Sequence, residues 1–345
     1  MSSTLPRVAI VGATGAVGTE LITCLERRAF PLRELRLFAS PRSAGRRLSF
    51  HGGSLPVEAL DQQSLTHIDI ALFSAGSTIS RLYAPAAARA GSVVIDNSSA
   101  FRMQGDVPLV VPEVNGDLIG SHHGIIANPN CVAIIAAMPL WPLHRTFSIR
   151  RIIAATYQAT SGAGAAAMDE LRQATRAALT GERFVPRVLR HPYAFNLYSH
   201  DSAVDPCTGS NEEELKVARE LRKIMGTAQL QVGVTCIRVP VLRAHATALT
   251  VEFDRRVSPT EARAALAAAP GVRLVDNVEA NHFPMPLEAS GQGDVLVGRI
   301  RRDGSDPSEH SLPMFIAGDQ LLKGAALNAV QIAESLPAPE RSAAA

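Results

Sequence analysis

The stretch that decides the fold is VGATGAVG, residues 11–18, near the start of a chain of 345 residues. A short β-branched run precedes it, and Ala16–Arg27 follows with the spacing of an amphipathic helix. In a strand-to-helix turn of this kind, Gly12 permits a tight turn, Gly15 lets the backbone approach a pyrophosphate, and Gly18 allows close packing. The first N–H groups of the helix then bind phosphate oxygens. The pattern predicts a dinucleotide-binding turn, and a turn without a ligand is the alternative.

Strand-like and helix-like runs alternate through the first third of the chain. The strand-like runs are short, apolar and β-branched, as expected for parallel strands that are buried on both faces. The predicted strands are residues 7–12, 34–39, 68–74 and 92–96, and the predicted helices are residues 16–27 and 77–90. This β-α-β succession predicts an α/β fold with a Rossmann-type, doubly wound sheet in the N-terminal domain.

The pattern changes after residue 150. Strand-like runs become longer and partly alternating, which favours an α+β domain with a mixed sheet. We expect strands at residues 151–158, 230–241, 247–253, 295–301 and 312–317, and helices at residues 165–179, 211–225 and 259–268. A last helix at residues 320–336 has one apolar side, and we expect it to return to the first domain.

The sequence therefore predicts two domains, as expected for a chain of this length. A dinucleotide-binding domain would comprise residues 1–130 together with the C-terminal helix at 320–337. A catalytic and dimerisation domain would comprise residues 131–319. Residues 338–345 are small and polar, and we expect them to form a frayed tail.

Composition excludes several classes of function. Apolar residues make up 46% and charged residues 19% of the chain, and the formal net charge is only +2. We therefore expect neither a nucleic-acid binder nor a membrane protein. The four cysteines are scattered without a C-x-x-C pair, which argues against a metal site and against disulfides. Because the N-terminus has no signal-peptide pattern, a cytoplasmic protein is expected.

The loop after the second strand indicates which dinucleotide binds. Enzymes that use NAD place Asp or Glu there to bind the ribose hydroxyls. This chain has ASPRSAGRR at residues 39–47, in which Arg42 and Ser43 suit a 2′-phosphate that a carboxylate would repel. NADP is therefore the expected cofactor, and a solvated basic loop is the alternative.

One cysteine stands where a thiol becomes reactive. The stretch NPNC, residues 128–131, follows a strand-like run that its proline is expected to stop. Cys131 then falls at the first turn of an apolar helix, which Pro139 and Pro142 are expected to end. At a helix start, N–H groups and the helix dipole lower the pKa of a thiol. On this pattern alone, a buried structural cysteine is the alternative.

Nine stretches, spread in order over nearly the whole chain, point to one family. They are GATGAVG at residues 12–18, RSAG at 42–45, DNSSAFRM at 96–103, VPEVN at 111–115, NPNC at 128–131, and residues 158–164, 213–216, 238–245 and 323–330. Together they resemble the aspartate-semialdehyde dehydrogenase family. Members of that family are homodimers that join through the C-terminal domain, so the resemblance implies a homodimer.

The resemblance implies which residues carry the reaction. Cys131 matches the nucleophile, which attacks the semialdehyde carbonyl and holds an aspartyl thioester. His245 matches the general acid/base, and Gln158 matches the catalytic residue that positions the substrate beside the cysteine. Arg238 matches the partner of the substrate carboxylate, and Glu213 the partner of its ammonium group. Opposite charges at a fixed spacing would orient the aldehyde toward sulfur.

The resemblance also implies the phosphate and cofactor sites. Arg102 and Lys216 match a phosphate-binding pair, to which we add Asn130, because inorganic phosphate is a dianion that needs cationic partners. Without the resemblance, Lys216 and Glu213 would be interpreted as a surface ion pair. The residues expected to bind the cofactor are Gly12, Thr14, Gly15, Ala16, Val17, Gly18, Arg42, Ser43, Ser161, Gly162 and Gln320.

The expected function is a reversible, NADP-dependent conversion of L-aspartate 4-semialdehyde and phosphate to L-4-aspartyl phosphate, for lysine, threonine and methionine biosynthesis. One alternative is an enzyme like N-acetylglutamyl-phosphate reductase, which has no use for an acidic partner such as Glu213. The other is a non-catalytic paralogue, although the nucleophile and the histidine are both present. Two positions depart from the family pattern: Thr247 replaces a glutamate, and Gln320 replaces an asparagine that contacts the nicotinamide amide.

Overall fold

A computed structural model describes residues 5–61 and 63–337 of the chain. The chain divides into two compact units, one from the described parts of Met1–Pro129 and Ala325–Ala345, and one from Asn130–Gly324. The expected tail, residues 338–345, lies outside the described residues. No described helix combines the length and the apolar character that a membrane span requires.

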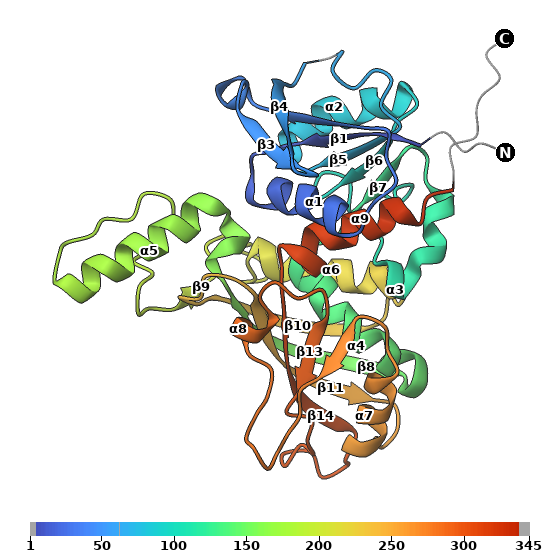
Figure 1. Cartoon of the computed structure of the whole chain (residues 1–345). Coiled ribbons are helices and arrows are strands. Elements are labelled where there is room, and N and C mark those ends of the chain that lie inside the picture. The colour runs from blue at the N-terminus through green and yellow to red at the C-terminus, as the bar shows by residue number, and fades with distance from the viewer. Residues whose placement is uncertain (1–4, 62, 338–345) are drawn as a thin grey trace. The chain divides into compact units, whose positions relative to one another are not determined.

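The first unit is built on a seven-stranded sheet with the order β3-β4-β2-β1-β5-β6-β7 (Figure 1). Neighbouring strands pair in parallel, except that β3 and β4 form an antiparallel hairpin. The central strands are short and buried, which confirms the predicted Rossmann-type sheet. The strands are β1 (Arg7–Val11), β2 (Glu34–Ala39), β3 (Arg47–Phe50), β4 (Gly53–Ala59), β5 (Ile70–Phe73), β6 (Val93–Asp96) and β7 (Ile125–Ala127).

Helices cover both faces of this sheet. Helix α2 (Ser77–Arg89) lies on one face, whereas α1 (Ala16–Arg27) and α9 (Leu327–Glu334) pack against each other on the other face (Figure 1). The C-terminal helix therefore returns to the first unit, as predicted. The remaining helices of this unit are η1 (Pro41–Ser43), α3 (Pro112–Asn115) and η2 (Gly116–Ser121).

The C-terminal helix begins later than its apolar pattern predicts. Residues 320 and 321 form a turn, η4 (Leu322–Ala326) is π-helical, and only then does α9 begin. The Asp319 carboxylate accepts N–H bonds from Leu321 at 2.9 Å and from Leu322 at 3.2 Å. These bonds are those of a helix N-cap, but the first backbone bond runs from the Gly324 N–H to the Asp319 carbonyl at 3.0 Å. This bond spans five residues, so the chain starts as a π-helical turn and not as an α-helix. The prediction of one helix that starts at residue 320 is therefore wrong.

The second unit contains a mixed seven-stranded sheet with the order β12-β13-β14-β11-β8-β10-β9. Two pairs, β8 with β10 and β12 with β13, are parallel, and the other neighbours are antiparallel. This confirms the predicted mixed sheet. The strands are β8 (Ile149–Gln158), β9 (Tyr198–Ser199), β10 (Gln231–Arg238), β11 (His245–Phe253), β12 (Val272–Leu274), β13 (Val295–Gly298) and β14 (Ser311–Gly318).

Helix α4 (Cys131–Phe147) packs against β8, β11, β13 and β14 and begins at the candidate nucleophile. It continues through Pro139 and Pro142, so the expectation that these prolines end it is wrong. Every residue from 132 to 140 is buried, and this packing outweighs the two missing N–H groups. The other helices of the unit are η3 (Thr160–Ala163), α5 (Ala165–Thr180), α6 (Glu212–Ile224), α7 (Pro259–Ala267) and α8 (Pro286–Ala289).

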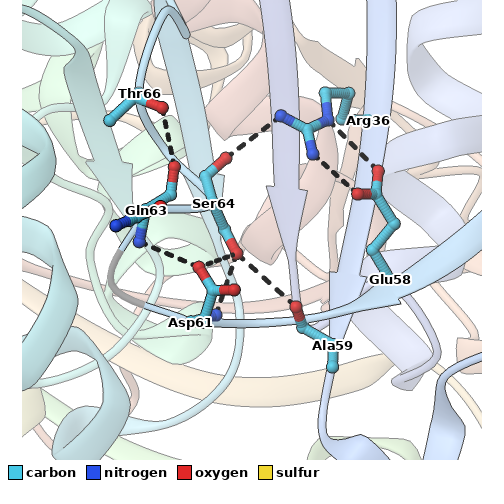
Figure 2. Close-up of polar contacts among 7 residues, drawn as sticks. All are labelled: Arg36, Glu58, Ala59, Asp61, Gln63, Ser64 and Thr66. Atoms are coloured by element: carbon cyan, nitrogen blue, oxygen red, sulfur yellow. Dashed lines mark hydrogen bonds and ion pairs between the residues drawn. The ribbon is translucent and has the colours of Figure 1, made fainter.

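In the first unit, an ion pair joins β4 to its neighbour β2. Figure 2 shows the Arg36 guanidinium, which binds both carboxylate oxygens of Glu58, at 3.1 Å and 2.6 Å, and donates to the Ser64 carbonyl at 3.3 Å. The Ser64 hydroxyl donates to Asp61 at 2.8 Å, which lowers the pKa of that carboxyl group. Because Arg36 binds Glu58 of β4, any cation that binds a ligand at the loop after β2 must be another side chain.

A buried carboxylate on α5 holds the segment that follows the helix. Glu170 accepts N–H bonds from Arg187, Val188 and Leu189 at 2.6, 2.7 and 2.8 Å. Burial alone would raise the pKa of Glu170, but the three N–H donors outweigh it and lower the pKa.

We expect Glu170→Ala to lower the free energy of unfolding by about 1–3 kcal/mol at pH 7. The carboxylate of the wild type stabilises the fold above its ordinary pKa, and this contribution is lost as pH falls through the lowered pKa of the folded state. Thermal unfolding midpoints measured from pH 7 to pH 3 should therefore converge for the two proteins at low pH. Glu182→Ala, an exposed change in the same segment, is the control. A constant difference at every pH would contradict this account.

Candidate active site

The candidate nucleophile stands at the first position of α4. Asn130 is the N-cap of this helix, and its side-chain oxygen accepts N–H bonds from Val132 at 2.9 Å and Ala133 at 3.3 Å. Cys131 is half-buried, so its sulfur lies near the positive end of a 17-residue helix and remains accessible. By contrast, burial raises the pKa of the Cys236 thiol to about 12. Of these two thiols, only Cys131 stands at the N-terminus of a helix.

One face of α6 holds the start of α4. The Glu213 carboxylate accepts a bond from the Asn130 amide at 2.9 Å and from the Gln158 amide at 3.2 Å. One carboxylate oxygen of Glu220 accepts the backbone N–H of Asn130 at 2.5 Å. Two carboxylates seven residues apart share a helix face, because seven residues complete almost two turns. The structure thus brings together three predicted site residues, Asn130, Gln158 and Glu213, and adds Glu220, which the sequence analysis missed.

Arg238 ends β10 and His245 begins β11, and both side chains are buried. Arg238 forms an ion pair with Asp201, with 3.1 Å between Nε and the carboxylate, and the sequence analysis missed Asp201. A Cβ atom placed on Gly162 would lie 3.2 Å from Nε2 of His245 and 3.9 Å from Nη1 of Arg238. The turn that carries Gly162 therefore faces both predicted side chains, and a larger residue there would press against the His245 ring.

The hydrogen-bonding of His245 defines its charge state. Its Nδ1 atom accepts the backbone N–H of Ala159 at 2.9 Å, so the hydrogen of the neutral ring resides on Nε2. Nε2 is buried and has no hydrogen-bond partner among the described residues. Burial, then the positive charge of Arg238 and the neighbouring His200, lower the pKa of His245 to about 3. The imidazole is therefore a neutral donor whose N–H group has no acceptor within the described protein.

The turn η3 and the segment after β14 are joined by one amide. Gln320 donates through Nε2 to the Ser161 hydroxyl and accepts the backbone N–H of Ala244 at 2.9 Å. A Cβ atom on Gly324 would lie 3.0 Å from Cβ of Cys131, so the same segment also reaches the nucleophile. Ser161, Gly162 and Gln320, which were predicted as cofactor-binding residues, thus lie in or beside the candidate active site of the second unit.

In the first unit, the glycine turn has the geometry that the sequence requires. Gly12 adopts φ +92°, and a Cβ atom there would lie 2.4 Å from the Ser74 carbonyl oxygen. A Cβ atom on Gly18 would lie 2.2 Å from the Gly12 oxygen, so strand and helix are too close for any side chain. The hydroxyls of Thr14 and Ser43 lie 3.5 Å apart, which joins the glycine turn to the loop after β2. The turn at the start of α1 therefore fits a pyrophosphate.

The two predicted phosphate-binding cations have different surroundings. Arg102, in the first unit, is buried and donates to the carbonyls of Asn128 at 3.0 Å and Asn97 at 2.7 Å. Lys216, on α6 of the second unit, forms a partly exposed ion pair with Glu212 at 3.4 Å. Within the described residues, no three His, Cys, Asp or Glu side chains cluster in a way that could hold a metal ion.

Comparisons with known proteins place this architecture in one class. Residues 7–122 match a family model described as the NAD-binding domain of semialdehyde dehydrogenases. Residues 140–323 match the model of the dimerisation domain of the same enzymes. The fold is therefore that of a semialdehyde dehydrogenase, with one domain for a nicotinamide dinucleotide and one for dimerisation.

Individual relatives narrow this class further. The aspartate-semialdehyde dehydrogenase of Synechocystis sp. is 51% identical over 96% of this chain and 97% of its own length. The enzyme of that name from Aquifex aeolicus is 47% identical over 96% and 97%. The crystal structure of aspartate semialdehyde dehydrogenase II from Vibrio cholerae, complexed with ASA, has a TM-score of 0.93 at 40% identity and covers 96% of this chain and 98% of that one.

The chain belongs to the aspartate-semialdehyde dehydrogenase family. Its function is that of an oxidoreductase of amino-acid biosynthesis, a phosphorylating aldehyde dehydrogenase that uses a nicotinamide dinucleotide.

Proposed function

We propose that the chain oxidises L-aspartate 4-semialdehyde with NADP and phosphate, through a thioester on Cys131. The observation that carries this proposal is the bond pattern around Glu213. Its carboxylate binds both the Asn130 amide, at the cap of the nucleophile's helix, and the Gln158 amide. A single anion thus gathers the cap of the nucleophile and the substrate-positioning residue, and it is suited to the ammonium group of an amino acid. An N-acylated substrate would have no use for it.

The cofactor site proposed for the first unit consists of the glycine turn, the start of α1 and the loop after β2. The close contacts of Gly12 and Gly18 and the hydroxyls of Thr14 and Ser43 support it. We assign dinucleotide binding to residues 1–130 with the C-terminal helix, and catalysis to residues 131–319, with Ser161, Gly162 and Gln320 on the nicotinamide side. When bound, NADP supplies the acceptor for the hydride of the substrate.

Cys131 and His245 divide the work at the carbonyl group. The Cys131 thiolate, stabilised by the start of α4, would attack the aldehyde carbon. Nε2–H of His245 would donate to the oxygen, which becomes an alkoxide. Because Nδ1 is occupied by the Ala159 N–H, His245 would act as a donor rather than as the general base that the family resemblance implies. An alkoxide, unlike a hydroxyl, needs no base before the C–H bond breaks.

Phosphate would then release the acyl group. Arg238 would bind the substrate carboxylate, and Arg102 with Lys216 and Asn130 would bind the phosphate dianion. A phosphate oxygen attacks the thioester carbon, the C–S bond breaks, and the thiolate leaves as the acyl phosphate forms. The proton carried by HPO₄²⁻ passes to solvent, so protons and charges balance.

We also propose a cytoplasmic homodimer. The sheet of the second unit has an apolar hollow on one face, lined in part by Ile153, Ala248, Thr250 and Phe315. Ile153 is 47% exposed, although it lies in the middle of β8, a strand with neighbours on both sides. A second copy of this sheet would cover these side chains. A reactive thiol at the active site favours a reducing compartment.

The choice of NADP is tested by Arg42→Ala. The Arg42 side chain is exposed in η1, next to Ser43, and it forms no ion pair among the described residues. We expect the change to raise the KM for NADP by about 10- to 100-fold, the effect of losing one charged hydrogen bond. The KM for NAD should stay unchanged, because NAD has no 2′-phosphate. The assay is the formation of NADPH or NADH from the semialdehyde and phosphate.

Arg33→Ala is the matched control, since it removes an exposed arginine at the opposite end of β2. It should leave both KM values within about two-fold of the wild type. An equal loss with both cofactors, or no loss with NADP, would contradict the proposed 2′-phosphate site. The dehydrogenase activity itself would still be measured by the same assay.

A further inference from the structure

Gln320 has both ends of its amide committed within the second unit. It follows β14 directly, and its side chain is only 2% exposed. The amide oxygen accepts the backbone N–H of Ala244 at 2.9 Å, and the amide nitrogen donates to the Ser161 hydroxyl. A residue whose only role was to bind nicotinamide would have no need of these two bonds.

The bond to Ala244 fixes the backbone immediately before His245. Ala244 has φ +71°, in the left-handed region that residues with a Cβ atom adopt at a cost. Such a conformation persists when surrounding contacts determine it. Ala244 is fully buried, and the Gln320 oxygen is the acceptor of its N–H group. Losing this bond would let the peptide rotate, and the imidazole of the next residue would move with it.

The bond to Ser161 fixes the opposite side of the imidazole. Ser161 precedes Gly162, where an added Cβ atom would lie 3.2 Å from the His245 ring. The position of the ring is therefore set by its own backbone and by the turn that it faces. The Gln320 side chain is bonded to both of these segments. Nδ1 can accept the Ala159 N–H only while the ring keeps this position.

From these contacts we propose that Gln320 is a positioning residue for His245, in addition to any contact with the cofactor. The inference rests on the proposed function only in giving His245 a catalytic role. By holding the ring in place, Gln320 keeps Nδ1 without a hydrogen, as the acceptor of the Ala159 N–H group. It also directs Nε2–H toward the substrate oxygen. Without Gln320, the ring would sample other positions and tautomers, and the reaction would slow with the cofactor still bound.

The first test reads the ring directly, without catalysis. In protein labelled with ¹⁵N-histidine, His245 of the wild type should give the signals of the Nε2–H tautomer at pH 7. Gln320→Leu, which is close in volume and forms neither bond, should shift these signals toward a mixture of tautomers. Gln320→Glu keeps an oxygen for Ala244 and should stay nearer the wild type. His245→Asn identifies the signals by their loss. Unchanged signals in Gln320→Leu would overturn the proposal.

The second test is a double-mutant comparison of kcat at saturating NADP. Gln320→Leu should lower kcat by about 10- to 100-fold, the usual effect of a small misplacement of a catalytic group. In the His245→Asn background the same change should cost less than about two-fold, because the residue that it positions is already gone. An equal loss in both backgrounds would overturn the proposal.

The two tests separate this inference from the proposed function. If Gln320→Leu changes the tautomer while kcat stays at the wild-type value, Gln320 does position the ring, and it is the catalytic role of His245 that is wrong. Ser161→Ala removes one of the two bonds and should give a smaller effect in both tests. The rate at which iodoacetamide alkylates Cys131 should remain that of the wild type in Gln320→Leu, which shows that the rest of the site is intact.

Discussion

Cys131→Ala is expected to abolish the phosphate-dependent formation of NADPH from the semialdehyde, with a loss of about 10⁴-fold or more. The sulfur is the atom that carries the acyl group, and no other side chain at the start of α4 can replace it. The change should leave the fold intact. Asn130 caps the helix through the backbone N–H groups of Val132 and Ala133, and alanine is a favourable residue within a helix.

The covalent step can be measured directly. When the wild-type enzyme receives aldehyde and NADP without phosphate, the acyl group has no acceptor and should stay on sulfur. Mass spectrometry should then find one added aspartyl group per chain in the wild type and none in Cys131→Ala. Cys207→Ala, which removes an exposed thiol in a loop, should keep its activity within about two-fold and should still become acylated. An active Cys131→Ala protein would rule out the thioester mechanism.

The sequence predicted those parts of the fold that follow from local patterns. The glycine turn and α1 lie within 16 consecutive residues, and strand and helix periodicities are legible over such a distance. The two errors concern features set by packing or by a single backbone bond. Helix α4 passes through Pro139 and Pro142 because the nine residues from 132 to 140 are all buried, and local sequence does not reveal this packing. The late start of α9 depends on the π-helical turn before it, in which the Gly324 N–H binds the Asp319 carbonyl at 3.0 Å.

The candidate site was predictable where the family resemblance reached, and not where contacts join distant residues. Cys131, Gln158, Glu213, Arg238 and His245 were identified by matching motifs. The bond from Asn130 to Glu220 spans 90 positions, the bond from Ala159 to His245 spans 86, and the pair Asp201–Arg238 spans 37. No local spacing encodes such contacts. Only Glu220 carried a usable signal, because it lies seven residues after Glu213 on the same helix.

His245→Leu is expected to lower kcat by about 10²- to 10³-fold, the usual cost of removing one donor to an oxyanion. The reason lies in the direction of the hydrogen bonds. Nδ1 accepts the Ala159 N–H, so Nε2 must carry the hydrogen and can only donate. Glutamine can place an amide N–H where Nε2–H stood, so His245→Gln should keep about ten-fold more activity than His245→Leu. If His245 acted as a general base, the two variants would instead lose the same activity, because neither leucine nor glutamine can take up a proton.

The pH dependence of kcat provides an independent check on the same residue. Burial and the neighbouring Arg238 and His200 lower the pKa of His245 to about 3, so the ring stays neutral between pH 5 and pH 8. Because the charged form is disfavoured over this whole range, protonation of His245 should cause no loss of activity there. The wild type and His245→Gln should therefore have kcat profiles of the same shape from pH 5 to pH 8. An acidic limb near pH 6.5 that is present in the wild type and absent in His245→Gln would mean that the imidazole gains a proton at Nδ1, and that the bond from Ala159 does not persist during turnover.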